Sequence, residues 1–324
     1  MNTTTERILA ALRAADGFVS GESLCHVLGI SRSAVWKHVH QLRENGYKIE
    51  SGSNRGYRLT GIANVPTQLE VSPLLKTKRF GRCLHYFAET ESTNNMAAEL
   101  ARKNSPEGTV VIADHQTAGR GRLQRQWHSP RGQNLYFSLI VRPEVPPNQA
   151  PQTALIAGLA LCRTVRTEFP NLEPRAKWPN DVYLNSRKLA GILCSMVSEM
   201  ERVQHLIIGV GLNVNMQSIP DDLRHAATSL KLATGASDIS RPGLLAAILG
   251  DLESAYDQWR ANGLASFLDE WQRTSYLTGR EVTIEVRNRK VSGRVCGIDS
   301  TGALQVKEPN GNIRPVVGGD VELM

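Results

Sequence analysis

Residues Gln116–Trp127 read Gln-Thr-Ala-Gly-Arg-Gly-Arg-Leu-Gln-Arg-Gln-Trp and follow a short apolar segment, Val110–Ala113. The stretch combines two glycines with three arginines and ends in a tryptophan. Glycine lets the backbone turn freely and approach a ligand closely, and arginine binds phosphate or carboxylate in two-point geometry. Tryptophan can pack against a flat ring. The pattern favours a loop that closes over an anionic, partly aromatic ligand such as a nucleotide; a basic surface loop with a packed tryptophan is the alternative.

The first 65 residues predict a separate unit. Three helical patterns precede a strand-turn-strand pattern; the second helix ends at Gly29, and Ser31 is suited to cap a third helix over 32–45 that stops before Gly46. This order indicates a winged helix-turn-helix. A small helical domain for protein contacts is the alternative. Independently of that choice, Trp36 can equally be partly core. The residues expected to contact DNA are Ser31, Arg32, Ser33, Trp36, Lys37 and Arg55.

A second motif lies at residues 177–193, which read Lys-Trp-Pro-Asn-Asp-Val-Tyr-Leu-Asn-Ser-Arg-Lys-Leu-Ala-Gly-Ile-Leu. Together with Gly-Arg-Gly-Arg at 119–122 and Ser-Thr-Asn at 92–94, it resembles the biotin protein ligases. The resemblance runs from about Ser92 to the C-terminus, and Lys-Trp-Pro-Asn-Asp followed by Lys-Leu-Ala-Gly-Ile-Leu is a specific signal. The N-terminal DNA-binding pattern narrows it to the bifunctional ligase-repressors of the biotin operon.

Composition sets the broad class. The 324 residues can hold two or three domains, and 41% hydrophobic and 21% charged residues are ordinary for a globular protein. The formal net charge of +7 favours polyanionic partners. The N-terminus lacks a signal-peptide pattern, and the longest apolar stretch, around 154–162, is too short to span a bilayer. We therefore expect a cytoplasmic protein without a membrane partner. The scattered cysteines argue against a zinc site or a disulfide framework.

The remaining pattern alternates strands and helices and then becomes all strand after residue 279, which suggests a small barrel. The expected strands are 82–87, 110–113, 134–141, 175–184, 188–200 and 202–213, and the expected helices are 95–103, 151–169, 241–262 and 264–274. With the resemblance, we expect a multidomain α+β protein. Its parts are the winged helix (1–65), a class II synthetase-like mixed α/β ligase domain (66–276) and an SH3-like β-barrel (277–324).

The resemblance implies an ATP-dependent, AMP-forming reaction in two steps. The carboxylate of biotin attacks the α-phosphate of ATP with Mg²⁺, giving biotinyl-5′-AMP and pyrophosphate. A lysine of the biotin carboxyl carrier protein of acetyl-CoA carboxylase then attacks the mixed anhydride and releases AMP. Both steps need positive charge and positioning rather than an enzyme nucleophile. Lys188, at the start of an apolar strand, is the expected catalytic cation together with Arg122; a plain surface lysine is the alternative.

The resemblance also assigns binding roles. For biotin it implies Ser92, Thr93, Asn94, Gln116, Arg120, Gly121, Arg122 and Lys188, and for the adenylate it implies Arg120, Arg125, Trp127, Asn180 and Asn213. Asp181 is a candidate Mg²⁺ ligand, although it can instead orient Lys188 or serve as a structural hydrogen-bond partner. The region 215–232, with Asp221 and Asp222, resembles a second loop over the adenylate.

One departure concerns the arginine loop. Where repressor-type ligases commonly continue Gly-Arg-Gly-Arg with Arg-Gly-Arg, this chain has Leu123-Gln124-Arg125. One charge and one glycine are missing. The difference bears on how tightly the loop closes, and not on which reaction occurs.

The resemblance further implies that the adenylate is both intermediate and corepressor. It would favour a homodimer that pairs two winged helices on a palindromic operator, and the carrier protein would compete with the second subunit for one sheet edge. Two other hypotheses are a ligand-sensing transcription factor without ligase activity and a lipoate or octanoate ligase. Lys188 and Gly-Arg-Gly-Arg argue against the first, and the winged helix argues against the second.

Overall fold

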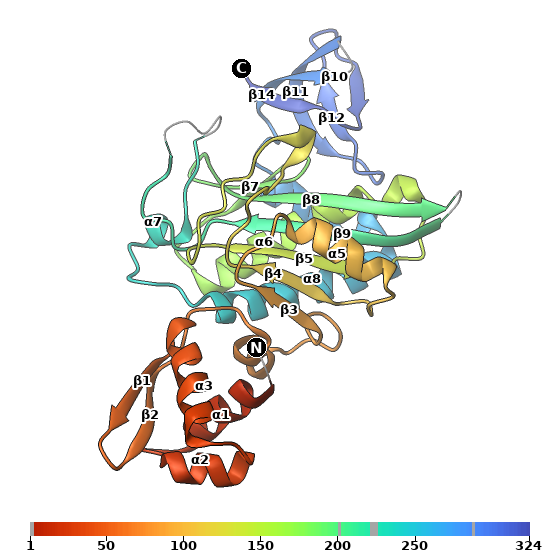
Figure 1. Cartoon of the computed structure of the whole chain (residues 1–324). Helices are drawn as coiled ribbons and strands as arrows, with labels where there is room; N and C mark the ends of the chain where they lie inside the picture. Colours follow the sequence, from red (N-terminus) through yellow and green to blue (C-terminus); the bar gives the residue numbers. More distant parts are fainter. Residues whose placement is uncertain (1–2, 200–201, 221–225, 287–288) are drawn as a thin grey trace. The chain divides into compact units, whose positions relative to one another are not determined.

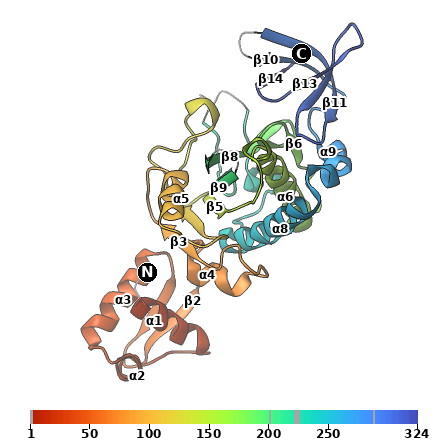
Figure 2. The ribbon, with the colours of Figure 1, turned by 90° about the vertical axis from the view of Figure 1, so that its right-hand side faces the viewer.

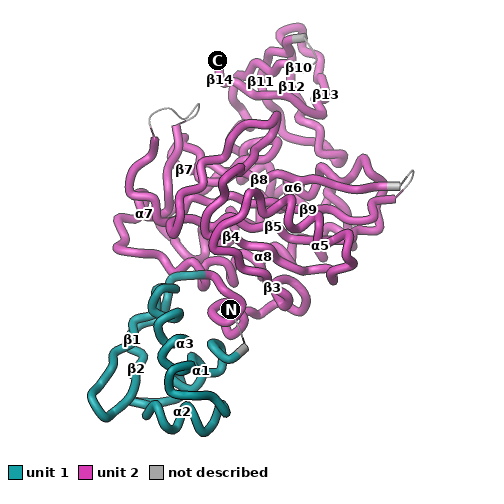
Figure 3. Tube along the Cα trace, viewed as in Figure 1, with its two compact units in different colours: residues 1–65 teal, residues 66–324 magenta. Residues whose placement is uncertain are grey.

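The structure is a computed structural model that describes residues 3–199, 202–220, 226–286 and 289–324. The chain divides into two compact units, residues 1–65 and residues 66–324 (Figure 3). Within the described ranges, no helix has both the length and the apolar character needed to cross a membrane.

The N-terminal unit is a winged helix-turn-helix, as predicted. Its elements are α1 (Thr3–Ala14), α2 (Gly21–Leu28), α3 (Arg32–Glu44) and a wing made of β1 (Lys48–Gly52) and β2 (Gly56–Gly61) (Figure 1). The Ser20 and Ser31 hydroxyls cap α2 and α3 by accepting backbone N–H bonds of 3.0 and 3.2 Å. Gly29 has φ of 66° at the turn between these helices, a conformation that glycine adopts without strain.

The second unit is built on a seven-stranded mixed sheet in the order β3-β4-β5-β9-β8-β7-β6. β3 and β4 pair in parallel, and the other neighbours are antiparallel. The strands are β3 (Leu84–Phe87), β4 (Val110–Ala113), β5 (Leu135–Val141), β6 (Arg175–Lys177), β7 (Asp181–Leu184), β8 (Arg187–Glu199) and β9 (Arg202–Leu212).

Helices cover both faces of this sheet, which is why β5 is buried along its whole length. Figure 2 shows α5 (Thr93–Arg102) on one side of β5, β8 and β9, and α6 (Gln152–Glu168) and α8 (Arg241–Asn262) on the other. Ile140 packs with α5, whereas its neighbour Leu139 packs in the larger core with α6 and α8. The remaining helices are α4 (Gln68–Val71), η1 (Ser72–Leu74), η2 (Arg122–Gln124), η3 (Pro147–Gln149), α7 (Leu230–Thr234), η4 (Leu264–Phe267) and α9 (Leu268–Thr274).

The C-terminal segment forms a five-stranded antiparallel sheet in the order β13-β12-β11-β10-β14. Its strands are β10 (Glu281–Val286), β11 (Arg289–Ile298), β12 (Leu304–Lys307), β13 (Ile313–Val316) and β14 (Asp320–Leu323). Trp178 joins this sheet to the central one, because its indole Nε1 donates to the Gly302 carbonyl at 3.0 Å. The predicted α+β architecture is confirmed.

Residues 175–184 differ from the prediction, which treated them as one strand. They form two strands, β6 and β7, which pair antiparallel with Lys177 opposite Asp181. Pro179 lies in the turn between them, and proline cannot contribute an N–H to a strand ladder. The hairpin brings the Lys-Trp-Pro-Asn-Asp motif to the end of the sheet.

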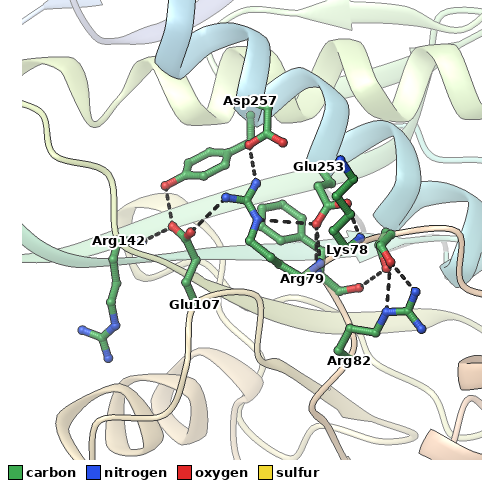
Figure 4. Close-up of polar contacts among 10 residues, drawn as sticks. Lys78, Arg79, Arg82, Glu107, Arg142, Glu253 and Asp257 are labelled. Carbon is green, nitrogen blue, oxygen red and sulfur yellow. Dashed lines mark hydrogen bonds and ion pairs between the residues drawn. The ribbon is translucent and has the colours of Figure 1, made fainter.

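A charged network fixes the segment before β3 to α8 (Figure 4). Arg79 makes an ion pair with Asp257 and lies 3.4 Å from Glu107 and 3.7 Å from Glu253. Glu253 accepts the backbone N–H groups of residues 78–80 at 2.7, 2.7 and 3.0 Å. Burial acts to raise the pKa of Glu253, but these backbone donors and Arg79 outweigh it and leave the pKa below its ordinary value.

Candidate active site

A cavity of about 490 Å³ opens where β8 and β9 meet the arginine loop and the C-terminal strand β14. Every pocket residue predicted from the sequence lines this cavity. These residues are Ser92, Thr93, Asn94, Gln116, Arg120, Gly121, Arg122, Arg125, Trp127, Asn180, Asp181, Lys188 and Asn213. The cavity also takes residues from β6 and β14 that the sequence did not single out.

A pair of glycines forms the floor under Trp127. Gly191 on β8 and Gly211 on β9 lie directly opposite each other. A Cβ at Gly211 would come within 2.4 Å of the Trp127 ring, and one at Gly191 within 2.9 Å. The indole therefore lies on bare backbone. Its Nε1 is buried and has no hydrogen-bond partner among the described residues, so the ring brings a free donor to the cavity wall.

Lys188 is held at a fixed point of the cavity. Its backbone N–H donates to Ala226 O at 2.8 Å, and its carbonyl accepts from Thr228 N at 2.9 Å. Its ammonium lies 2.8 Å from Asp181 Oδ1 and 5.3 Å from the centre of the Trp127 ring. An ammonium placed this way can compensate negative charge that develops on a bound ligand.

The arginine loop is a closed hairpin despite its missing glycine. Gly121 N donates to Arg125 O at 2.7 Å, and Trp127 N donates to Gly119 O at 2.9 Å. At the tip, Leu123 and Gln124 have φ of 56° and 59°. Two consecutive left-handed residues define a type I′ turn, which favours asparagine and glycine.

Two side chains outside the loop hold its arginines. Arg122 Nη1 donates to Asn180 Oδ1 at 3.2 Å. Arg125 makes an ion pair with Asp320 of β14, in which Nη1 lies 3.3 Å from Oδ1. The loop is thereby attached to the β6–β7 turn and to the C-terminal sheet.

A polar corner lies at the start of α5. The Thr93 backbone N and Oγ1 both donate to Gln116 Oε1, at 2.9 and 3.2 Å. Ser138, which the sequence reasoning missed, donates to Asn94 Oδ1 at 2.6 Å, and Asn94 Nδ2 donates to Leu193 O at 3.1 Å. Ser92 occupies the N-cap position of α5 without a side-chain capping bond. The side chains of Thr93, Asn94 and Gln116 are thus held in place by hydrogen bonds within the protein.

The two predicted adenylate-binding asparagines also support the cavity wall. Asn180 Nδ2 donates to Ile192 O at 2.8 Å, and Asn213 Nδ2 donates to Thr228 O at 3.0 Å. The bond to Thr228 anchors one end of the expected second loop. Residues 221–225 of that loop, including Asp221 and Asp222, lie outside the described residues.

Asp320 and Lys177 are charged cavity residues to which the sequence analysis gave no role. Asp320 follows Arg125 by 195 positions, and nothing local in the sequence links them. Lys177 Nζ lies 3.3 Å from Tyr183 Oη and 4.8 Å from the centre of that ring. Burial lowers the pKa of Lys177, although Asp181 acts to raise it.

The metal assignment of Asp181 receives no support from its surroundings. Across the part of the chain that the structure describes, no three histidine, cysteine or acidic side chains gather as a metal site. The Asp181 carboxylate instead faces the Lys188 ammonium. Asp181 is thus placed where it can orient Lys188.

The predicted DNA-binding residues of the N-terminal unit are all exposed. Trp36 is 59% exposed, so the alternative in which it is partly core is wrong. Ser31 caps α3, and Arg32, Ser33 and Lys37 follow on the surface of that helix. In the wing, the Arg55 guanidinium lies 4.5 Å and the Arg58 guanidinium 5.0 Å from the centre of the Phe18 ring.

Comparisons with known proteins agree with this architecture. Residues 86–213 match the biotin/lipoate A/B protein ligase family, residues 4–58 an HTH domain, and residues 277–324 a biotin protein ligase C-terminal domain. The chain is 38% identical to the bifunctional ligase/repressor BirA of Bacillus subtilis over 100% of both chains. It is 32% identical to the BirA of Escherichia coli, covering 97% of this chain and 96% of the relative.

A similar solved structure is the biotin protein ligase from Aquifex aeolicus in complex with biotin and ATP. It matches with a TM-score of 0.65 and 29% identity, over 75% of this chain and 99% of its own.

Proposed function

The chain belongs to the family of bifunctional biotin protein ligases and transcriptional repressors, and on this basis we propose which of its residues serve each function. As a ligase the protein joins biotin to protein with ATP as the second substrate, and as a repressor it binds DNA. The residue roles, the metal, the dimer and the cellular location that follow are proposals. They include the division of residues 66–324 into a ligase domain (66–276) and a C-terminal domain (277–324).

The observation that carries the ligase assignment is the fixed ammonium of Lys188 inside the cavity. We assign Lys188 and Arg122 to the reacting centre, where biotin carboxylate meets the α-phosphate of ATP. Asp181 holds the Lys188 ammonium at 2.8 Å, and Asn180 holds Arg122. Fixed cations stabilise developing negative charge without reorganising during the reaction. The same cations serve the second step, in which a carrier lysine attacks biotinyl-5′-AMP.

The polar corner is assigned to the ring system of biotin. Ser92, Thr93, Asn94 and Gln116 supply amide and hydroxyl groups that match the donors and acceptors of a ureido ring. The bond between Thr93 and Gln116 and the bond from Ser138 to Asn94 fix the orientation of these side chains. Arg120 and Gly121 belong to the hairpin that covers this end of the cavity.

The adenylate is assigned to the side of the cavity that carries Trp127. The indole offers a flat apolar face and the unpartnered Nε1 donor. Arg125 reaches the same space from the hairpin, and Asn180 and Asn213 line it. Base stacking on an aromatic ring contributes about 1–3 kcal/mol per base in proteins that bind single-stranded nucleic acid.

We propose that Mg²⁺ enters the cavity with the triphosphate. Mg²⁺ usually keeps several waters and takes one or two carboxylates besides substrate phosphates. Asp181 is the candidate for such a carboxylate, but its ion pair with Lys188 favours the orienting role. No step of the proposed reaction depends on a metal bound by the protein itself.

The carrier protein and a second subunit are both assigned to the edge of β8. β7 pairs with β8 only at residues 187–191, whereas β9 pairs with β8 as far as Glu199. In the described chain no strand continues the β7 side beyond this point. A free edge can accept a strand from another chain. We propose that the biotin carboxyl carrier protein docks there, and that the adenylate-bound protein forms a homodimer through the same edge.

The repressor function is assigned to the exposed side of α3 and to the wing. Arg32, Ser33, Trp36 and Lys37 are placed to reach phosphates and base edges of operator DNA, Ser31 stands at the start of the helix, and Arg55 extends from the wing tip. A homodimer places two such helices on a palindromic operator. Both the operator and the carrier protein are expected in the cytoplasm, where we place this protein.

Biotin-dependent ATP–pyrophosphate exchange tests the adenylation half-reaction. We expect exchange with biotin and none with lipoate, octanoate or no acid. Exchange with lipoate or octanoate alone would move the protein to that sister activity. No exchange with any acid would leave a ligand-sensing transcription factor.

A further inference from the structure

Lys177 differs from two other cations of the cavity, Lys188 and Arg125, in its surroundings. Lys188 and Arg125 each face a carboxylate, that of Asp181 and that of Asp320. Lys177 instead contacts the hydroxyl and the ring of Tyr183. Among the described residues, no carboxylate lies within ion-pair distance of its ammonium. The positive charge of Lys177 is therefore not balanced by an ion pair with any described residue of the protein.

The sheet places Lys177 at a defined position relative to the reacting centre. Lys177 on β6 pairs with Asp181 on β7, and β7 pairs in turn with β8, which carries Lys188. The three charged residues therefore follow one another across adjacent strands as cation, anion and cation. Tyr183, which supports the Lys177 ammonium, is itself stacked on Tyr276 with ring centres 4.8 Å apart.

The environment of Lys177 favours an anion. Its side chain is partly buried, so its ammonium has lost part of its hydration. A phenol and an aromatic face replace only part of that loss. Burial has lowered the pKa of this lysine, which means that its charged form is under-compensated. A ligand anion at this point would supply the missing counter-charge, and ATP brings three phosphates into the cavity.

We propose that Lys177 binds the β- and γ-phosphates of ATP and neutralises the pyrophosphate that leaves in the adenylation step. This inference rests on the proposed ligase function. In that step a carboxylate oxygen of biotin bonds to the α-phosphorus, and the bond from this phosphorus to the α,β-bridging oxygen breaks. The bonding electron pair stays on that oxygen and leaves with pyrophosphate. A cation on β6, two strands away from Lys188 on β8, stabilises this charge.

The assignment separates Lys177 from Lys188 in the reaction sequence. Biotinyl-5′-AMP no longer carries the β- and γ-phosphates, so Lys177 has no ligand atoms to contact in the transfer step. Lys188 acts on the acyl phosphate and is needed in both steps. A lysine that merely supports the fold would affect both steps together.

The test uses the full-length protein and its Lys177→Gln, Lys177→Arg and Lys188→Gln variants. The first assay is biotin-dependent ATP–pyrophosphate exchange. The second assay supplies synthetic biotinyl-5′-AMP and measures biotin transfer to purified biotin carboxyl carrier protein without ATP. Thermal unfolding of each variant shows whether it is folded.

For Lys177→Gln we expect kcat/KM for ATP to fall by roughly 10- to 100-fold, the range for losing a hydrogen bond to a charged group. Transfer from biotinyl-5′-AMP should stay within about twofold of the parent protein, as expected when no transition-state contact is lost. Lys177→Arg should recover part of the exchange activity because it keeps the charge. Lys188→Gln should lose activity in both assays.

Equal losses in both assays for Lys177→Gln would overturn the assignment, and so would normal kinetics for ATP in the exchange assay. If the parent protein itself shows no biotin-dependent exchange, then the proposed function fails, which is a distinct outcome.

Discussion

The tip of the arginine hairpin stores strain that a two-residue change should release. Leu123 and Gln124 both adopt left-handed φ, at 56° and 59°, in the turn that closes the loop. Asparagine followed by glycine is the preferred pair for such a turn. We expect Leu123→Asn combined with Gln124→Gly to favour the closed hairpin and to slow the release of biotinyl-5′-AMP.

The size of the effect follows from the two residues. A left-handed non-glycine residue costs about 1–2 kcal/mol, so the pair stores roughly 2–4 kcal/mol. The new glycine reduces this stabilisation of the closed hairpin by about 0.5–1 kcal/mol, because glycine is more flexible when the loop is open. The net shift toward the closed hairpin is about 1–3 kcal/mol, which corresponds to roughly a 5- to 150-fold change in the opening equilibrium.

The assay follows dissociation of prebound, radiolabelled biotinyl-5′-AMP during a chase with unlabelled ligand. Ser186→Gly is the matched control: Asn185 and Ser186 also have left-handed φ, at 49° and 61°, so this change creates the same Asn-Gly pair in the β7–β8 turn. The control should leave dissociation unchanged. If the loop variant releases the adenylate as fast as the parent protein, while remaining folded, then turn strain does not govern retention.

Three further changes test other parts of the structure. Gly211→Ala should displace the Trp127 indole, because the new Cβ would lie 2.4 Å from its ring. We expect the KM for ATP in the exchange assay to rise at least tenfold. An unchanged KM would contradict the stacking role of Trp127. Glu253→Gln should lower the free energy of unfolding by about 1–3 kcal/mol at neutral pH. Because the pKa of Glu253 is depressed in the folded protein, the contribution of Glu253 to stability is present above the ordinary glutamate pKa and is lost as the pH falls through the lower folded-state pKa. The free energies of unfolding of the two proteins, measured by urea titration, should therefore converge in acid. A difference that stays constant with pH would refute this. Phe18→Leu removes the aromatic ring under the Arg55 guanidinium. Fluorescence anisotropy should then show roughly two- to fivefold weaker binding to operator DNA. An unchanged affinity for the operator would mean that the ring has only a structural role.

The sequence predicted the residues of the cavity better than their contacts. Ser92, Gln116, Trp127 and Lys188 are far apart in the chain, yet they line one cavity. Motif resemblance can identify such residues, because each motif is local. It cannot show that Asn213 bonds to the Thr228 carbonyl, since that contact depends on how the chain returns to the sheet.

Two features lay beyond local patterns for physical reasons. The turn at Pro179 is not one of them, because Pro-Asn-Asp at 179–181 is a local turn signal that the one-strand prediction overlooked. Asp320 was missed because an aspartate in a short strand carries no local sign that it will meet Arg125 across the fold. The left-handed tip of the hairpin was also unpredictable, because leucine and glutamine rarely adopt that conformation.

The pairing of charges in the cavity bears on which ligand it favours. An anion that binds Lys188 or Arg125 must compete with the carboxylate of Asp181 or Asp320, so its gain is only the difference between two ion pairs. An anion that reaches Lys177 breaks no existing ion pair. A ligand with a single carboxylate at the reacting centre therefore gains little from charge, whereas ATP bound as we propose would reach Lys188, Arg125 and Lys177 at once. By this reasoning the triphosphate, more than the carboxylate of biotin, draws the charged side chains of the cavity away from their internal partners.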